Sequence, residues 1–232
     1  MKKLLTFLIL LFSLTSNVVW SADYNKGWNA YEIGDYATAL REFKPLAEQG
    51  DDDAQFYMGI MYDNGLGVPQ DYMTAVKWYT LSAEQGDSDS QNNLGLIYAN
   101  GPSFLKNYNK ALKWFRLAAE QGDHQSQTSL GYMYSEGLGV SQDYKTAMKW
   151  LRLAAEQGDP GAMYNISLMY YYGEGVIQDN VYAHMWANIS ASNGDENGVM
   201  ARDVIAKEMT SSDISKAQNL ARECVAKNYK GC

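Results

Sequence analysis

The chain has 232 residues, of which 46% are hydrophobic and 20% are charged, and its formal net charge is −8. This composition is typical of a folded globular protein and excludes an intrinsically disordered one. An acidic chain with dispersed charges does not favour nucleic acid or an anionic membrane surface as its main partner.

The first 21 residues have the layout of a secretory signal peptide. Two lysines precede an apolar run over 4–14, and small residues follow at Ser21 and Ala22. The run is shorter than the ~20 residues that span a bilayer. We expect residues 1–21 to be cleaved, after Ser21 in preference to Ala22, which predicts a periplasmic or secreted mature protein without stable membrane insertion.

A repeat of 36 residues organises most of the chain. The string AEQGD begins at residues 47, 83, 119 and 155, and a degraded copy, SNGD, keeps the spacing at 192–195. Within each period, Ala, Trp and Leu recur three residues apart on one face of a helix, about Tyr72 to Gln85 in the first full copy. A second helical stripe precedes it and begins at Ala54. Units of this size cannot bury their apolar stripes alone, so the period predicts stacking into an α-solenoid.

A turn joins the two helices of each unit. In NGLGVPQD, over 64–71, two glycines permit positive φ and the final Asp suits an N-cap. The copy NGPSFLKN, over 100–107, lacks the second glycine, so we expect a different turn there. Small residues in the first helices should let the paired helices approach closely: Gly59, Gly95 and Gly131, with Ser167 in the last copy.

These residues resemble the Sel1-like repeat family, relatives of the tetratricopeptide repeats. The resemblance rests on AQFYMGIMYDNGLGVPQDYMTAVKWYTLSAEQGD over 54–87, on three further copies, and on a shorter tetratricopeptide-like unit over 27–50. It implies an all-α fold, a right-handed superhelix of helix pairs with a concave groove, and an exported bacterial member of a family of adaptors. The expected boundaries are 1–21 for the signal peptide, 22–50 for the short unit, 51–86, 87–122, 123–158 and 159–194 for four repeats, and 195–232 for a C-terminal capping segment.

The C-terminal segment predicts a capping helix that shields the last repeat. Thr210 stands three residues before Asp213, as at a capped helix start. The chain has two cysteines, Cys224 and Cys232. In an oxidising compartment we expect them to pair and to contribute about 2–3 kcal/mol. The alternative is two unpaired thiols in a frayed end.

Nothing in the chain combines a nucleophile with an activating base, so we predict no enzymatic activity, no cofactor and no metal site. His124 and His184 occupy unrelated phases of their repeats. The string SFLK, over 103–106, fits the S-x-x-K pattern of serine β-lactamases, but the chain lacks the partner strings S-D-N and K-T-G. The repeated tryptophans favour interhelical packing, and the acidic residues of AEQGD favour capping and solvation.

Positions that vary between the copies are free to contact a partner. On the first helix of each unit, one polar and aromatic stripe lies away from the apolar stripe. In the resembling families the first helices line the concave face, so this stripe is the candidate groove, although it can also be a merely solvated face. Its members are Tyr57, Asn64, Asn93, Asn100, Ser129, Glu136, Asn165 and Tyr172.

The leading hypothesis is an exported scaffold that binds another protein or a peptide in this groove. A second hypothesis is a protein that binds a cell-envelope glycan such as peptidoglycan, which the 18 tyrosines leave open. A third, weaker one is an envelope hydrolase of the β-lactamase type.

Overall fold

The computed structural model describes residues 22–232, so the predicted signal peptide lies outside the described residues. Residues 22–232 form twelve α-helices and no strand, and the predicted all-α solenoid of stacked helix pairs is confirmed. The helices are α1 (Tyr24–Glu32), α2 (Tyr36–Glu48), α3 (Asp52–Asn64), α4 (Tyr72–Glu84), α5 (Ser88–Asn100), α6 (Tyr108–Glu120), α7 (His124–Glu136), α8 (Tyr144–Ala155), α9 (Pro160–Tyr172), α10 (Asn180–Ser192), α11 (Glu196–Ala206) and α12 (Ser211–Ala226).

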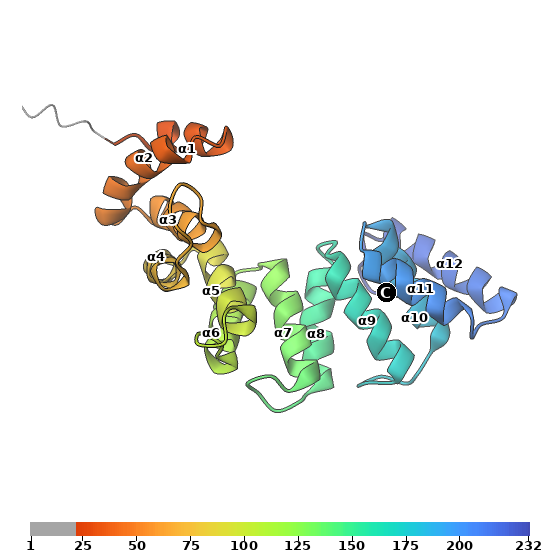
Figure 1. Cartoon of the computed structure of the whole chain (residues 1–232). Coiled ribbons are helices and arrows are strands. Elements are labelled where there is room, and N and C mark those ends of the chain that lie inside the picture. The colour runs from red at the N-terminus through yellow and green to blue at the C-terminus, as the bar shows by residue number, and fades with distance from the viewer. Residues whose placement is uncertain (1–21) are drawn as a thin grey trace, which may run out of the picture.

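The helices form an elongated, curved stack in which the chain advances from α1 at one end to α12 at the other (Figure 1). Each helix from α1 to α11 packs mainly on its neighbours in sequence, whereas α12 packs on α10. In addition, the first helices of successive units, α3, α5, α7, α9 and then α11, contact one another in series. The second helices α4, α6, α8 and α10 make at most marginal contact among themselves. The first helices therefore lie on the shorter, inner side of the curve.

Local sequence fixes where the helices start. Each of the twelve described helices follows an Asp, Asn or Thr whose side chain accepts a hydrogen bond from a backbone N–H of the first turn. This N-cap satisfies a donor that the helix itself cannot pair. The predicted capping role of the repeated Asp is thus confirmed.

Close approach within each helix pair depends on one glycine. A Cβ added to Gly59, Gly95 or Gly131 would lie 2.5 Å from a side chain of the paired helix. In the last unit a larger residue, Ser167, replaces the glycine. A smaller residue, Ala187, replaces the large side chain that the glycine faces in the other units. The predicted role of the glycines is confirmed, and their partners are Tyr79, Phe115 and Leu151 respectively.

The AEQGD string forms the joint between successive units. At 83–87, Ala83 is buried, Gly86 adopts φ 109°, and the Asp87 carboxylate accepts the N–H of Ser90 at 2.6 Å. The positive φ, which favours glycine, turns the chain from one unit into the next. The same cap recurs at Asp51, Asp123 and Asp159.

Buried glutamines cross three of the joints, and Met163 takes the equivalent position at the fourth. The Gln91 side-chain amide donates to the Ala83 carbonyl at 3.0 Å, and the Gln121 amide donates to Gln91 Oε1 at 2.9 Å. Gln91 is 4% exposed, so these bonds satisfy polar groups that water does not reach. The same pairs form on either side: Gln55 with Gln85, and Gln127 with Gln157.

The repeated Ala-Trp-Leu face is covered only in part. Its alanines and three of its tryptophans, Trp78, Trp114 and Trp186, are buried. Its leucines are exposed, because neighbouring second helices lie too far apart to cover them: Leu81 at 38%, Leu117 at 38% and Leu153 at 40%. The equivalent Ile189 is 1% exposed and belongs to the same core cluster as Ala221 and Cys224 of α12.

The segment after 195 contains two helices, where the sequence predicted one. Asp195, from the degraded joint SNGD, caps α11. Helix α11 packs on α9 and α10 in the place of a further first helix, whereas α12 packs on α10. The predicted start of α12 is confirmed, because Thr210 Oγ1 accepts the N–H of Asp213 at 3.2 Å.

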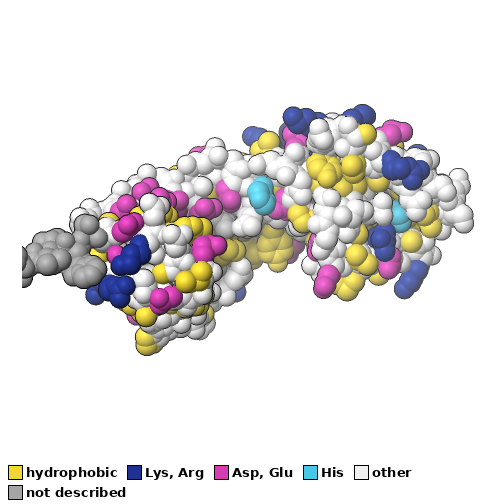
Figure 2. All heavy atoms as spheres, turned by 90° about the horizontal axis from the view of Figure 1, so that it is seen from above, with side chains coloured by type: hydrophobic (Ala, Val, Ile, Leu, Met, Phe, Trp, Pro, Cys, Tyr) yellow, Lys and Arg dark blue, Asp and Glu magenta, His cyan; other side chains and the backbone are white. Residues whose placement is uncertain are grey.

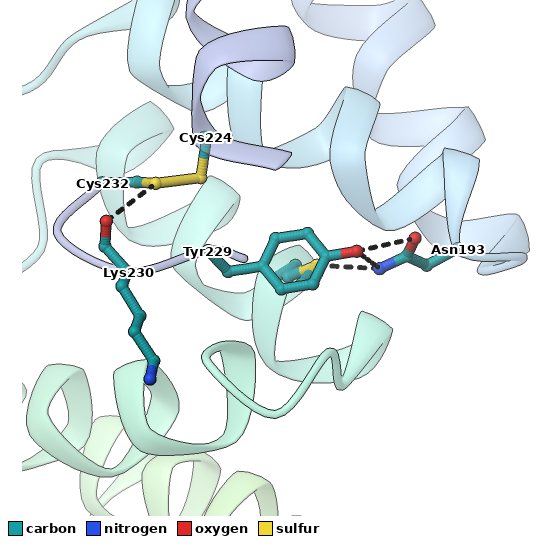
Figure 3. Close-up of a disulfide and its surroundings, with 6 residues drawn as sticks. Asn193, Cys224, Tyr229, Lys230 and Cys232 are labelled. Carbon is teal, nitrogen blue, oxygen red and sulfur yellow. Dashed lines mark hydrogen bonds between the residues drawn. A yellow bond between two sulfur atoms is a disulfide. The ribbon is translucent and has the colours of Figure 1, made fainter. Parts of the chain in front are cut away.

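The predicted disulfide is present between Cys224 and Cys232, eight residues apart (Figure 3). It closes the tail after α12 into a loop. In this loop the Tyr229 hydroxyl accepts a hydrogen bond from the Asn193 amide at 3.2 Å, which ties the tail to the end of α10 (Figure 3).

Replacing Gln127 by Ala should lower the free energy of unfolding by about 1–3 kcal/mol, because the Ala119 carbonyl and the Gln157 amide lose a buried partner. Urea denaturation followed by circular dichroism measures the change. The matched control is Glu120→Ala at an exposed position of the joint over 119–123, which Gln127 crosses. Equal stability of the two variants would contradict the role of the glutamines.

Replacing both cysteines by serine should lower the free energy of unfolding of the oxidised chain by about 2–3 kcal/mol, because the unfolded chain regains loop entropy. The wild-type chain under reducing conditions serves as the control and should match the double variant. If oxidised wild type and variant unfold at the same urea concentration, the disulfide does not stabilise the tail.

Candidate binding groove on the first helices

Three pockets follow one another along the first helices from α5 to α11. The first lies between α5 and α7 and has a volume of about 430 Å³. The second, between α7 and α9, has about 140 Å³, and the third, between α9 and α11, about 200 Å³. Tyr132 and Asn165 line both the first and the second pocket, and Leu168 and Tyr172 line both the second and the third. The pockets therefore adjoin one another in a row on the inner side of the curve, and together they are called the groove.

The groove brings together five of the eight residues predicted to bind a partner. Asn100 and Ser129 line the first pocket, Glu136 lines the second, and Asn165 and Tyr172 each line two pockets. These residues come from three different helices, α5, α7 and α9.

The other three predicted residues lie outside these pockets, towards the N-terminus. The Asn64 side chain is exposed, and its amide donates to the Ile60 carbonyl of its own helix at 3.0 Å. Asn93 is half-buried on α5. Tyr57 is half-buried on α3, so the three residues do not extend the groove.

Tyr57 belongs to a packed aromatic cluster. Its ring stacks on Phe43 with 4.9 Å between centroids and also meets the rings of Tyr24, Trp28 and Tyr31. Burial, followed by the nearby Tyr24 and Tyr31, raises the pKa of Tyr57 to about 12. The ring thus joins the short N-terminal unit to the first full repeat.

Lys106 is a groove residue that sequence reasoning did not select. In the regular turns a glutamine occupies the equivalent position, and its amide donates to a carbonyl at the end of the preceding first helix. In the irregular turn Gly101 has φ −68° and ψ −172° in place of the left-handed conformation, which confirms the predicted difference. The amine of Lys106 lies over the Tyr108 ring, 5.1 Å from its centroid, and lines the first pocket.

The S-x-x-K pattern falls in this irregular turn. Ser103 is exposed, while Lys106 faces Tyr108 and the groove.

Two carboxylates line the second pocket. Glu136 is exposed at the end of α7, and Glu174 accepts the Tyr144 hydroxyl at 3.3 Å. Burial and then the charge of Glu174 raise the pKa of Tyr144, with Glu136 contributing in the same direction. This part of the groove is therefore acidic.

The third pocket is mainly apolar. Met200 and Val204 of α11 line it and are 60% and 49% exposed. Leu168 of α9 lies opposite them. The Tyr171 hydroxyl donates to Glu208 at 2.8 Å, which ties α9 to the turn after α11. An apolar side chain of a ligand can be buried in this pocket.

The two histidines make contacts outside the groove. His124 Nδ1 lies 2.7 Å from the carboxylate of Asp159, the N-cap of α9, which also accepts the Thr128 hydroxyl at 3.0 Å. His184 is 3% exposed, and its burial lowers its pKa. Within residues 22–232, no three or more His, Cys, Asp or Glu side chains are grouped as a metal ion requires.

Charge is unevenly distributed along the stack. Figure 2 shows acidic side chains gathered over the N-terminal half of one face, while basic side chains lie towards both ends of that face. At the start of α3, burial and the neighbouring Asp52 and Asp51 raise the pKa of Asp53. None of the described helices combines the length and apolarity needed to cross a bilayer.

The stacked pairs and the open groove define a tandem-repeat α-solenoid, a class that presents an extended binding surface. The Sel1 repeat model matches four consecutive segments, 52–87, 88–123, 124–159 and 160–195. The chain belongs to the Sel1 repeat family. Proteins of this family generally serve as protein–protein interaction scaffolds.

Solved structures agree with this assignment. A protective antigen, c5321, present in uropathogenic Escherichia coli strains and displaying an SLR fold, is 34% identical with a TM-score of 0.79 over 89% of this chain and 46% of its own. This chain thus spans about half of the antigen. A Sel1 repeat protein from Oxalobacter formigenes is 34% identical with a TM-score of 0.72 over 89% and 85% of the two chains.

An immunity protein, Pa5087 from Pseudomonas aeruginosa, is 17% identical with a TM-score of 0.50 over 88% of this chain and 80% of its own, which shows the fold alone. No match was found among curated protein sequences.

The packed state of Tyr57 predicts a pH effect. Its folded pKa of about 12 exceeds the ordinary value of 10.0, so its contribution to stability is complete below pH 10 and is lost as pH rises towards 12. The Tyr57→Phe variant should therefore lose less stability than wild type between these two pH values. Urea denaturation at several alkaline pH values measures the two slopes, and parallel slopes would show that the Tyr57 phenol ionises normally.

Proposed function

We propose that the chain is an exported interaction scaffold that binds an extended segment of another protein in the groove along α5, α7, α9 and α11. The observation that carries this proposal is that the three pockets adjoin one another in a row. A single groove that crosses four first helices suits an extended chain better than a small compact ligand.

The division of labour between positions supports the proposal. Residues that recur in every unit build caps, joints and cores, whereas the groove residues change from unit to unit. One position of the groove, for example, carries Asn100, Glu136 and Tyr172 in successive units. Side chains of this kind bind a peptide through hydrogen bonds and aromatic contacts, which are common at protein interfaces.

Export is supported by two independent features. The start of the chain has the layout of a signal peptide, and Cys224 and Cys232 are bonded. Disulfides persist in oxidising compartments and are rare in reducing ones. The proposed location is therefore the periplasm or the outside of the cell.

Glycan binding is a second candidate, favoured by one observation. Tyr132 and Tyr172 line the groove and are 48% and 63% exposed. Exposed aromatic faces can stack on sugar rings as well as on peptide side chains. The same groove would then bind peptidoglycan or another envelope glycan.

Photocrosslinking tests the proposal. A photoreactive phenylalanine analogue replaces Tyr172, which is aromatic, exposed and shared by two pockets. The matched control carries the analogue at Met73, 59% exposed on α4. We expect a discrete protein to be captured in cells from position 172 and not from position 73.

Mass spectrometry identifies the captured species. Equal capture from both positions, or no capture from either, would contradict the groove assignment. Capture of a glycan from position 172 alone would replace the protein partner with the second candidate.

A further inference from the structure

The three pockets differ in chemistry, and their order along the groove is fixed by the fold. The third pocket is apolar, the second carries two carboxylates, and the first carries a lysine. Because each pocket is built by a different pair of first helices, a ligand cannot meet these features in another order.

We infer that the groove selects an extended peptide segment with an apolar, a basic and an acidic side chain, in that order from α11 to α5. This inference rests on the proposed function and adds the chemistry of the partner. Complementary charge is what distinguishes this partner from a purely apolar or a uniformly charged chain.

The apolar side chain fits the third pocket. Leu168 of α9 and Met200 and Val204 of α11 supply its apolar surface. The exposure of Met200, 60%, means that a ligand side chain placed there removes apolar area from water. Tyr164 and Tyr172 also line this pocket. Methionine adapts to different apolar shapes, so a leucine, methionine or aromatic side chain can fit.

The basic side chain fits the second pocket. Glu136 and Glu174 come from the end of α7 and from the turn after α9. Both carboxylates line one pocket of about 140 Å³, and the Tyr144 hydroxyl donates to Glu174 at 3.3 Å. An arginine or lysine of the ligand would place its positive charge beside both carboxylates, which can accept its hydrogen bonds.

The acidic side chain fits the first pocket. Among the described residues that line the three pockets, Lys106 is the one lysine or arginine. Asn100 and Ser129 line the same pocket and offer hydrogen-bond donors beside its amine. In the regular turns a glutamine occupies this position, and its amide donates to a backbone carbonyl at the end of the preceding first helix. A cation at this position therefore occurs in one unit of the stack.

The helix spacing sets the spacing of the ligand side chains. Packed helices lie about 8–10 Å apart. An extended peptide advances about 3.3–3.6 Å per residue. Successive ligand side chains should therefore be about three residues apart.

Selection from a random library of 12-residue peptides tests the inference. All peptides are amidated at the C-terminus, so that a terminal carboxylate cannot replace the acidic side chain. We expect the purified chain to enrich sequences with an apolar residue, then Arg or Lys about three positions away, then Asp or Glu about three positions further. A selected peptide whose basic and acidic residues are exchanged should bind about tenfold more weakly in fluorescence anisotropy.

Charge-matched variants assign each preference to its pocket. Lys106→Gln introduces the residue of the regular turns and should remove the preference for the acidic residue alone. Glu136→Gln with Glu174→Gln should remove the preference for the basic residue alone. The controls are Lys216→Gln and Glu84→Gln with Glu120→Gln, at exposed positions outside these pockets, and they should keep both preferences. A selective loss of one preference cannot arise from unfolding, which would weaken all peptides equally.

Four results would overturn the inference. Enriched peptides without the charge order, or exchanged peptides that bind equally well, would remove the charge pattern while leaving the scaffold function intact. Self-association of the chain that the glutamate variants abolish would make a second copy the occupant. A library that yields no binder, together with no capture from position 172, would overturn both the inference and the proposed function.

Discussion

The hydrogen-bonded joint between units is the interaction on which the rest of the structure depends. At the three joints over 47–51, 83–87 and 119–123, a glycine with positive φ turns the chain, an aspartate caps the next helix, and the side-chain amide of a buried glutamine in that helix donates to the carbonyl of the alanine that begins the joint. These glutamine bonds are buried, so an angle between units that broke them would leave polar groups unpaired, at a cost of about 1–3 kcal/mol each. A repeated five-residue string thereby sets the curvature of the whole stack.

That curvature creates the groove. The joints bring the first helices of successive units into contact and leave the second helices apart. The first helices therefore lie close together on the inner side of the stack, and the second helices are spread apart on its outer side. The opening leaves Leu81, Leu117 and Leu153 partly exposed on the outer helices. On the inner side the same geometry places in one row the positions that take no part in the caps, joints or cores. Sequence variation at those positions changes the binding surface without disturbing the joints.

The irregular turn shows how one unit gains a distinct function. Its loss of a left-handed glycine frees the position of Lys106 from the backbone contact that a glutamine makes elsewhere. A conformational change of a few residues thus places a cation in a groove that otherwise carries carboxylates, tyrosines and apolar side chains. The two ends of the groove therefore differ in chemistry, whereas those of a perfectly regular solenoid would be alike.

Internal repetition made most of the fold predictable from sequence. The helix pairs, the glycine contacts, the aspartate caps and the different turn at 100–107 all followed from comparing the copies with one another. Helix α11 was missed because it occurs once, although Asp195 at the end of the degraded joint marks its start. The packing of Tyr57 could not be foreseen either, because its aromatic neighbours come from the short N-terminal unit, which has no second copy for comparison.

The groove itself was only partly predictable. Five of the eight selected residues line it, since the helical stripe fixed which face they occupy. Lys106 depends on a turn conformation that its residue type does not reveal, and Met200 lies on the helix that was missed.

Hydrogen–deuterium exchange of the chain with and without a selected peptide tests the central claim most directly, namely that the inner first helices form the binding surface. If these helices bind the peptide, we expect slower exchange in α5, α7, α9 and α11 and in the turn over 101–107, with unchanged exchange in α4, α6 and α8. Protection confined to the second helices, or to the aromatic cluster around Tyr57, would contradict it.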